Sequence, residues 1–153
     1  MIRTATTNDL SGIAELEQEW LSGVPTWGYR SRSESELREL PGSNTLVAIE
    51  DQKIIAFAVC APRTHDGSCI YTEGDRIMEV VDLFVSRNWR GKGVGQALLT
   101  AIEVQAKKDQ YTKLIVYSSV RDIDGVLAFY RASGFSSWSI QLFKELSPDV
   151  LSE

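Results

Sequence analysis

Three glycines within five residues, Gly91, Gly93 and Gly95, separate a strand-like segment from a helix-like one. The apolar run before them covers residues 80–85, and a helical pattern follows over residues 93–108. Glycine readily adopts left-handed backbone conformations, so such a loop can turn successive N–H groups toward one point, and the following helix adds its positive end. The junction therefore predicts an anion site of the size of a phosphate or pyrophosphate, with glycine letting the anion approach the amides.

Two well-known phosphate-binding motifs do not account for this loop. The dinucleotide-binding fingerprint needs the spacing G-x-G-x-x-G, whereas the glycines here follow G-x-G-x-G. A Walker loop needs a lysine followed by serine or threonine, but Lys92 is followed by glycine. An R-x-x-G-x-G pattern over residues 90–95 remains, and it opens an amphipathic helix. A tight turn without a ligand is the alternative interpretation.

The rest of the chain alternates strand-like and helix-like segments, with no internal repeat and no linker. At 153 residues, one domain over residues 1–153 is expected. Strands are expected at residues 1–5, 45–50, 53–61, 77–85, 113–119 and 135–146, and helices at residues 9–21, 34–40, 93–108 and 122–133. This order, β-α-α-β-β-β-α-β-α-β, predicts an α/β (α+β) fold with a mixed central sheet of about six to seven strands flanked by about four helices.

Charge and cysteine content exclude several classes of function. A formal charge of −5 argues against nucleic acid as the main partner. No window approaches eighteen apolar residues, so no membrane span is expected. Two cysteines, Cys60 and Cys69, without a secretory leader predict a reduced, cytoplasmic setting. The single histidine, His65, is expected to be exposed, and it forms no metal site with these cysteines.

Two segments carry a resemblance to a known family. Over residues 82–99, Asp-Leu-Phe-Val is followed four residues later by Arg-Gly-Lys-Gly-Val-Gly-Gln-Ala-Leu-Leu. This segment resembles the acyl-CoA signature of the GNAT superfamily of acyl-CoA-dependent N-acetyltransferases. Residues 128–135 look like the family's helix–turn segment, which ends in F-Y-x-x-x-G-F. The resemblance covers nearly the whole chain and implies the GNAT fold, with transfer of an acetyl group from acetyl-CoA to a primary amine of a small molecule or peptide by direct attack.

The resemblance also implies where acetyl-CoA, the acyl donor, would bind; no metal is implied. The pantetheine arm would lie along the strand before the glycine loop, and an amide near its middle would donate to the thioester oxygen. The side chains of Arg90 and Lys92 would either add positive charge or stay solvated. The cofactor-binding residues are therefore expected to be Leu83, Phe84 and Val85 for the arm, and Arg90, Gly91, Lys92, Gly93, Val94, Gly95 and Gln96 for the pyrophosphate.

Glu79 and Asp82 are the candidate general bases. An alkylammonium has a pKa of about 10.4, so a base that removes its proton is useful at neutral pH. Both carboxylates interrupt an otherwise apolar strand, and both match acidic positions of the family. Their odd separation places them on opposite faces of a regular strand, unless a β-bulge brings them to one side. The alternative for either is a structural role, paired with Arg76 or a backbone group.

Tyr130 matches the family tyrosine that protonates the leaving thiolate; a tyrosine of the core is the alternative. Ile123 stands where many members carry an asparagine that contacts the cofactor, so that contact is in doubt. Trp27 and Tyr29 fall in a loop that borders the acceptor site in similar proteins, where they either contact substrate or fold the loop onto the domain.

The segment after Phe135 is short, which leaves part of the substrate wall to another element or to a second subunit, as in a homodimer. Two other functions stay open at this point. One is a non-catalytic acyl-CoA-binding module, and the other is a nucleotide-phosphate binder that uses the glycine loop. The identity of the acceptor amine is not encoded in these motifs.

Overall fold

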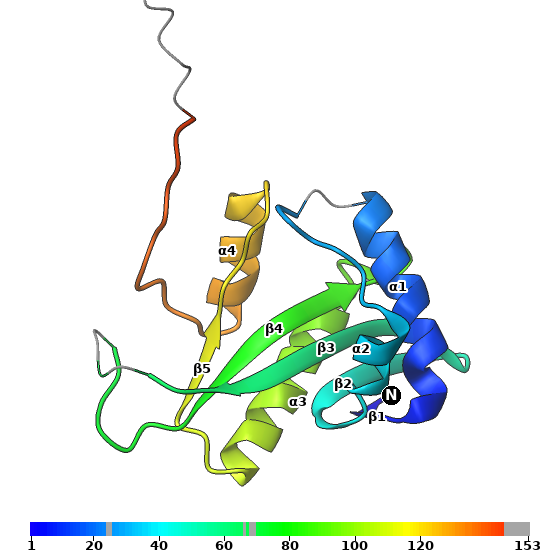
Figure 1. Cartoon of the computed structure of the whole chain (residues 1–153), viewed down its shortest axis with the longest axis horizontal. Helices are drawn as coiled ribbons and strands as arrows, with labels where there is room; N and C mark the ends of the chain where they lie inside the picture. Colours follow the sequence, from blue (N-terminus) through cyan, green and yellow to red (C-terminus); the bar gives the residue numbers. More distant parts are fainter. Residues whose placement is uncertain (24–25, 66, 68–69, 146–153) are drawn as a thin grey trace, which may run out of the picture.

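The computed structural model describes residues 1–23, 26–65, 67 and 70–145 of the chain. Most helices and strands of the structure lie close to the residue ranges predicted from the sequence. The elements are β1 (Ile2–Ala5), α1 (Leu10–Gly23), α2 (Glu34–Arg38), β2 (Gly42–Glu50), β3 (Lys53–Arg63), β4 (Ile77–Val85), α3 (Val94–Lys108), β5 (Lys113–Val116) and α4 (Ile123–Ala132), with short 3-10 turns at Thr7–Asp9 and Arg87–Trp89 (Figure 1).

The sheet has the order β1-β2-β3-β4-β5, in which the first four strands are antiparallel and β5 runs parallel to β4. Pairing between β4 and β5 covers only residues 77–80 and 113–116. Beyond this point β4 continues for another five residues, 81–85, which have no strand partner on that edge within the described chain. The edge strand β5 therefore parts from β4, and an open backbone edge of β4 leads toward the glycine loop.

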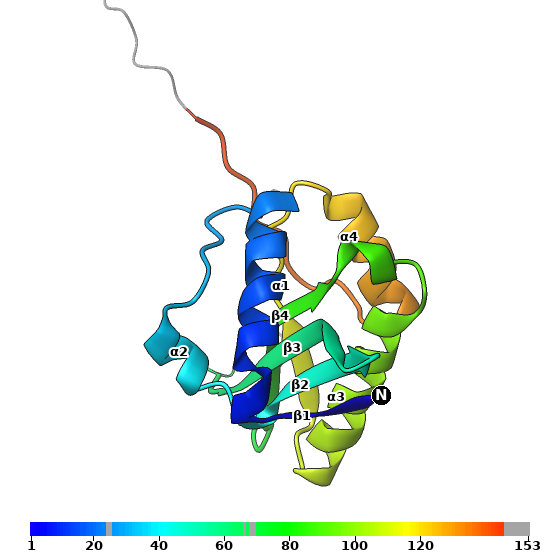
Figure 2. The ribbon, with the colours of Figure 1, turned by 90° about the vertical axis from the view of Figure 1, so that its right-hand side faces the viewer.

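Helices cover both faces of the sheet. Figure 2 shows α3 and α4 together on one side and α2 on the other, with α1 on the same face as α2. Strand side chains alternate between the faces, so each face buries its own apolar set. The α3 face buries Ala48, Ala56, Ala58, Val80, Leu98, Leu99 and Ile102, and the α1 face buries Ile13, Leu16, Val47, Phe57 and Phe84.

The element boundaries follow recognisable local chemistry. Ser33 and Glu36 form the predicted capping box of α2. Asp122 caps α4 through the N–H of Gly125 at 3.1 Å. Gly134 follows the helix at φ 85°, the left-handed conformation that ends many helices. The mixed α/β architecture and the predicted order of elements from β1 to α4 are confirmed.

The predicted final strand over residues 135–146 is wrong for residues 135–145, while residue 146 lies outside the described residues. The sheet accordingly has five strands rather than six to seven. Ile140 and Leu142 are 83% and 82% exposed, so their alternation buries nothing within the described chain. Alternation shows that a segment can be extended, but a strand also needs a neighbouring edge to pair with. Among the described residues, the helices are all too short or too polar to cross a bilayer.

Asp9 ties the start of the chain together. Its carboxylate accepts from both Nη atoms of Arg3 at 2.6 and 2.8 Å and from the backbone and hydroxyl of Thr6. The Arg3 guanidinium is the main reason that the pKa of Asp9 lies well below its usual range. Such a carboxylate contributes stability above its unfolded pKa of about 3.9, and the contribution is lost as pH falls through the acid range toward the folded value.

Asp9→Asn is therefore expected to lower the free energy of unfolding by about 1–3 kcal/mol at pH 7. The difference from wild type should shrink at pH 3, because the wild-type carboxylate is then losing its own contribution. Urea unfolding at both pH values measures the two differences. Glu50→Gln, at an exposed strand end, is the control and should cost little at either pH. An equal loss for Asp9→Asn at pH 7 and pH 3 would contradict the assignment.

Candidate active site

The glycine loop presents a row of free backbone donors. The first helical hydrogen bond of α3 runs from the N–H of Ala97 to the carbonyl of Gly93 at 2.9 Å, and no side chain caps the helix. The six N–H groups of residues 91–96 thus have no acceptor among the described residues. They lie at the positive end of a 15-residue helix. This arrangement is suited to bind an anion.

Gly91 and Gly93 carry the loop's conformation. Their φ angles are 71° and 79°, and nothing lies within 4 Å of where a Cβ would stand on either residue. Both are therefore required by the left-handed backbone and not by crowding. Gly95 differs, because its Cβ would stand 3.1 Å from Cζ of Phe129 on α4. Gly95 therefore has a packing role that the sequence did not indicate, because it lets α3 pack closely against α4.

Gly93→Ala should weaken binding of CoA by about tenfold, since a side chain in the left-handed region costs about 1–2 kcal/mol and the loop can relax away from that conformation. Isothermal titration with CoA measures the change. Gly74→Ala is a matched control, because Gly74 has φ 87°, an equally open Cβ site and a place in another loop. Loss of affinity in both variants, or in neither, would speak against a specific role for the residue 91–96 amides.

The two cationic side chains of the loop fold back onto the protein. Arg90 Nε donates to the carbonyl of Val85 at 3.0 Å, and its guanidinium lies 5.3 Å from the ring centre of Phe84. Lys92 Nζ lies 4.7 Å from the ring centre of Trp89. Arg90 therefore braces the loop against the end of β4, and it occupies one of the backbone carbonyls that the sequence predicts for the pantetheine arm.

The strand that leads to the loop has one paired and one open edge. Leu83, Phe84 and Val85 pair with β3 on one side. Their other edge faces the gap where β5 has separated from β4. Leu83 and Val85 point to the α3 face and Phe84 to the α1 face. An extended ligand can therefore add to this edge as a further strand would.

A β-bulge brings the two predicted bases to one face. On β3, Val59 pairs with Asp82 and the next residue, Cys60, pairs with Val80, so Val81 is an extra residue on β4. Val80 faces α3, so its neighbour Glu79 points to the α1 face. Asp82 also points to that face, because it binds Arg32, which in turn binds Glu17 of α1. The bulge that the sequence analysis considered is present.

Each of these carboxylates is paired with an arginine, and neither arginine is Arg76. Glu79 accepts from Nε of Arg63 on β3, and Asp82 accepts from Arg32 in the segment before α2. Both carboxylate side chains are 13% exposed. Arg76 instead donates to the carbonyl of Asp109 at 3.0 Å. The sequence predicted acidic residues here but not their partners.

Arg32 also binds a second carboxylate, Glu17 of α1, whose side chain is 1% exposed. The backbone N–H of Arg32 donates to the same carboxylate at 2.8 Å. Glu17, Arg32 and Asp82, here called the Arg32 cluster, thus link α1, the α1–α2 segment and β4. Sequence reasoning missed this cluster. Its signal was Glu17 itself, a charge on the apolar stripe of α1 that needs a buried partner.

Aromatic stacking holds the same segment down. Tyr29 stacks on Trp20 of α1 with ring centres 4.3 Å apart, and Trp20 stacks in turn on Phe84 at 5.1 Å. The Tyr29 hydroxyl is buried and has no hydrogen-bond partner among the described residues. Burial raises its pKa, and the negative charges of Glu17 and Asp82 add to the effect. Of the two alternatives for Tyr29, the structure favours folding of the loop onto the domain.

The segment also reaches the chain between β5 and α4. Thr26 forms a β-bridge with Val120, and the N–H of Trp27 donates to the carbonyl of Ser119 at 2.7 Å. The indole of Trp27 stays exposed, with the guanidinium of Arg121 4.5 Å from its ring centre. Residues 26–32 therefore span from the segment that follows β5 to the Arg32 cluster over the α1 face.

Tyr130 on α4 is half-buried between Phe129 and Phe135, with ring centres 5.1 and 5.3 Å away. Burial, with smaller contributions from Cys60 and Asp82, raises its pKa to about 12. Its hydroxyl, protonated at neutral pH even at the ordinary tyrosine pKa of about 10, can donate. Burial likewise raises the pKa of the Cys60 thiol to about 12, so this cysteine is not a thiolate nucleophile. The second cysteine, Cys69, lies outside the described residues.

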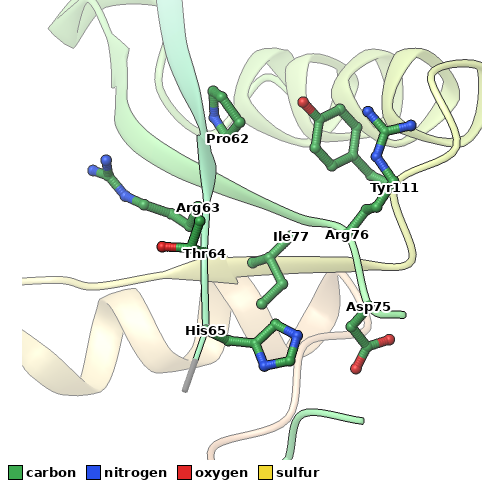
Figure 3. A pocket seen from close by; sticks show the side chains of 8 residues that line it. All are labelled: Pro62, Arg63, Thr64, His65, Asp75, Arg76, Ile77 and Tyr111. Carbon is green, nitrogen blue, oxygen red and sulfur yellow. The ribbon is translucent and has the colours of Figure 1, made fainter. Parts of the chain in front are cut away.

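Two adjoining hollows share Arg63, Thr64 and His65, and only the second is lined by Glu79. The first, of about 330 Å³, includes His65, Asp75, Ile77 and Tyr111 (Figure 3). The second, of about 590 Å³, includes Arg63, Glu79, Tyr117 and Trp138. The structure therefore gives Glu79, unlike Asp82, a place on a cavity wall.

His65 lies between the two hollows and differs from expectation. It is half-buried rather than exposed, stacks against Tyr71 and accepts from the N–H of Gly67 at 3.0 Å. No group of three metal-ligating side chains occurs within the described part of the chain.

The comparisons agree on one family. The sequence model of the acetyltransferase (GNAT) family matches residues 13–135. No curated protein sequence matched the chain. The aminoglycoside acetyltransferase meta-AAC0020 from an uncultured soil metagenomic sample, solved with trehalose, is similar at 20% identity, 96% coverage of each chain and a TM-score of 0.72.

Two further solved structures have the same fold. AAC(6')-Iy in complex with the bisubstrate analog CoA-S-monomethyl-acetylneamine is 18% identical, with 97% of this chain and 98% of that chain covered and a TM-score of 0.72. A ribosomal-protein-alanine N-acetyltransferase from Brucella melitensis biovar Abortus 2308 is 18% identical, with 95% and 98% covered and a TM-score of 0.68. These structures confirm the fold that the resemblance implied, and the family match over most of the sequence shows that the chain belongs to the acetyltransferase (GNAT) family of acetyl-CoA-dependent N-acetyltransferases.

Proposed function

We propose that this chain transfers an acetyl group from acetyl-CoA to a primary amine of a small molecule or peptide by direct attack. The observation that carries the proposal is the row of unpartnered N–H groups over residues 91–96, next to the open edge of β4. The N–H groups offer a site for the pyrophosphate of CoA. The adjacent open edge of β4 offers a site for its pantetheine arm. Acetyl-CoA supplies the activated acyl group.

Glu79 is the base in this proposal. It lines the larger hollow, where an amine can arrive from solvent, and it accepts the proton of the amine directly or through water. Asp82 has a different task, because its carboxylate is held by Arg32 beneath residues 26–32. We therefore assign Glu79 to proton transfer and Asp82 to anchoring of the loop that borders the acceptor.

The remaining groups act on the acyl carbon and the sulfur. The amine nitrogen forms a bond to the thioester carbon, and the carbon–sulfur bond breaks. Backbone N–H groups near Leu83 and Phe84 donate to the oxyanion that forms between these events. Tyr130 donates its proton to the departing thiolate, so an amide and a free thiol result. A covalent route through Cys60 is disfavoured by its buried thiol, whose pKa is about 12.

The test combines binding with turnover. Calorimetry with CoA, ATP and NAD measures ligand choice, and release of free thiol from acetyl-CoA in the presence of an amine panel measures transfer. CoA binding with amine-dependent thiol release is the expected result. CoA binding without thiol release for any amine would instead favour a non-catalytic acyl-CoA-binding module. Binding of ATP or NAD in place of CoA would favour a nucleotide-phosphate binder.

A further inference from the structure

Arg63 lines the larger hollow, and only part of its guanidinium is engaged in an ion pair. Its Nε donates to Glu79, whereas its Nη1 and Nη2 have no acceptor among the described residues. The side chain is 46% exposed, and it lines the larger hollow as well as the smaller one. The contrast with Arg32 is clear, because both Nη atoms of Arg32 are bound to carboxylates. Arg63 therefore offers a guanidinium edge to whatever occupies the hollow.

Among the described residues, the larger hollow has no unpaired carboxylate to neutralise the free guanidinium edge of Arg63. Among the described residues that line the larger hollow, Glu79 is the one carboxylate, and it is already paired with Arg63. Asp75, in the smaller hollow, is bound to Lys113 Nζ at 2.6 Å and Thr112 Oγ1 at 2.8 Å. Figure 3 shows the Arg63 side chain extending away from Asp75. A polycationic acceptor would thus meet a free guanidinium without a compensating carboxylate.

We propose, on the basis of the acetyltransferase function proposed above, that the acceptor is a free α-amino acid. In such a molecule the amine and the carboxylate are attached to the same carbon. The amine would lie at Glu79, and the carboxylate would accept from the Nη edge of Arg63, a planar fork that matches carboxylate geometry. The rings of Tyr117 and Trp138 line the same hollow and provide an apolar wall for the amino-acid side chain.

A matched set of acceptors tests this inference. L-phenylalanine, L-phenylalaninamide and phenethylamine share one ring and one amine, and only the first carries a carboxylate; L-methionine, L-leucine and their amides extend the set. Hydrogen bonds to charged groups are worth about 1.5–3 kcal/mol, so kcat/KM for each acid should exceed that for its amide by about 10- to 100-fold. The amide has the more acidic ammonium and hence more free amine, so intrinsic reactivity acts against this result. Sisomicin, a polyamine without a carboxylate, should be a poor acceptor.

Variants identify the residue responsible. Arg63→Gln should bring the acid-to-amide ratio of kcat/KM to about one, and Arg63→Lys should give an intermediate ratio because it keeps the charge and loses the fork. Arg76→Gln, which removes an arginine from the neighbouring hollow, should leave the ratio as in wild type. Urea unfolding of each variant verifies that the ratio is compared between folded proteins.

Each outcome bears on one proposal or the other. Equal turnover of acid and amide, faster turnover of sisomicin, or an unchanged ratio in Arg63→Gln would overturn the amino-acid assignment while the acetyltransferase proposal stands. A chain that binds CoA and releases thiol with none of the acids would overturn it as well. Failure to bind CoA would instead remove the proposed function itself, and the calorimetric measurement separates these two cases.

Discussion

Replacing Tyr130 by phenylalanine is expected to lower kcat by about 10²-fold while changing the affinity for CoA by less than about threefold. The phenylalanine keeps the ring contacts with Phe129 and Phe135, so α4 should remain packed against the sheet. It removes only the hydroxyl, which is protonated at neutral pH as in any tyrosine and whose pKa burial raises further, to about 12. Without that donor the thiolate must leave unprotonated or take its proton from water.

Steady-state kinetics with acetyl-CoA and an amine, together with calorimetry for CoA, measure the two effects separately. Tyr111→Phe is the matched control, since Tyr111 lies under the guanidinium of Arg76 away from β4's open edge. It should retain wild-type kcat. If Tyr130→Phe retained full kcat, Tyr130 would be a core residue and another group would supply the proton.

Arg32→Met should lower the free energy of unfolding by roughly 3–5 kcal/mol, because it leaves Glu17 and Asp82 without their shared cation. The side chain of Glu17 is buried too deeply for water to replace the guanidinium. For a chain of this size the loss corresponds to a decrease in Tm on the order of 10 °C. Urea unfolding monitored by circular dichroism measures the free energy, and a thermal scan measures the Tm.

Arg30→Met supplies the control from the same segment. Arg30 pairs with Glu36 at the surface with a side chain that is 71% exposed, so its loss should cost far less stability than the loss of Arg32. In a Glu17→Gln, Asp82→Asn background, Arg32→Met should cost much less than in wild type, because the uncompensated charges are gone. Equal costs for Arg30→Met and Arg32→Met would show that the Arg32 cluster is not a buried charge network.

The elements that could be predicted from sequence are those specified by a few neighbouring residues. Gly93 starts α3 and Gly134 ends α4 through their left-handed backbone, and the Ser33 side chain caps α2, each within about one turn of chain. The bulge near Val81 was also foreseeable, since two acidic residues at odd spacing interrupt one apolar strand. Candidate residues for binding and proton transfer came from the same local patterns and from the family motifs that contain them.

Other features depend on register and packing. Asp82 meets Arg32 across 50 residues of sequence, and Glu79 meets Arg63 only because β3 and β4 pair in one register. Residues 135–145 are a case in which the local pattern predicted too much. Their alternating pattern predicts a strand, but a strand must also pair with a free edge, which the pattern cannot supply.

By itself, the amino-acid sequence determined the glycine loop, the order of elements and the family, because glycine conformation, capping and apolar periodicity are properties of the local chain. Only the tertiary structure decided that Glu79 lines a cavity, that Asp82 is held beneath a loop by a buried arginine, and that Arg63 has a free guanidinium edge. Ion pairs between distant residues have no local signature, since their energy depends on burial and distance after the sheet has formed.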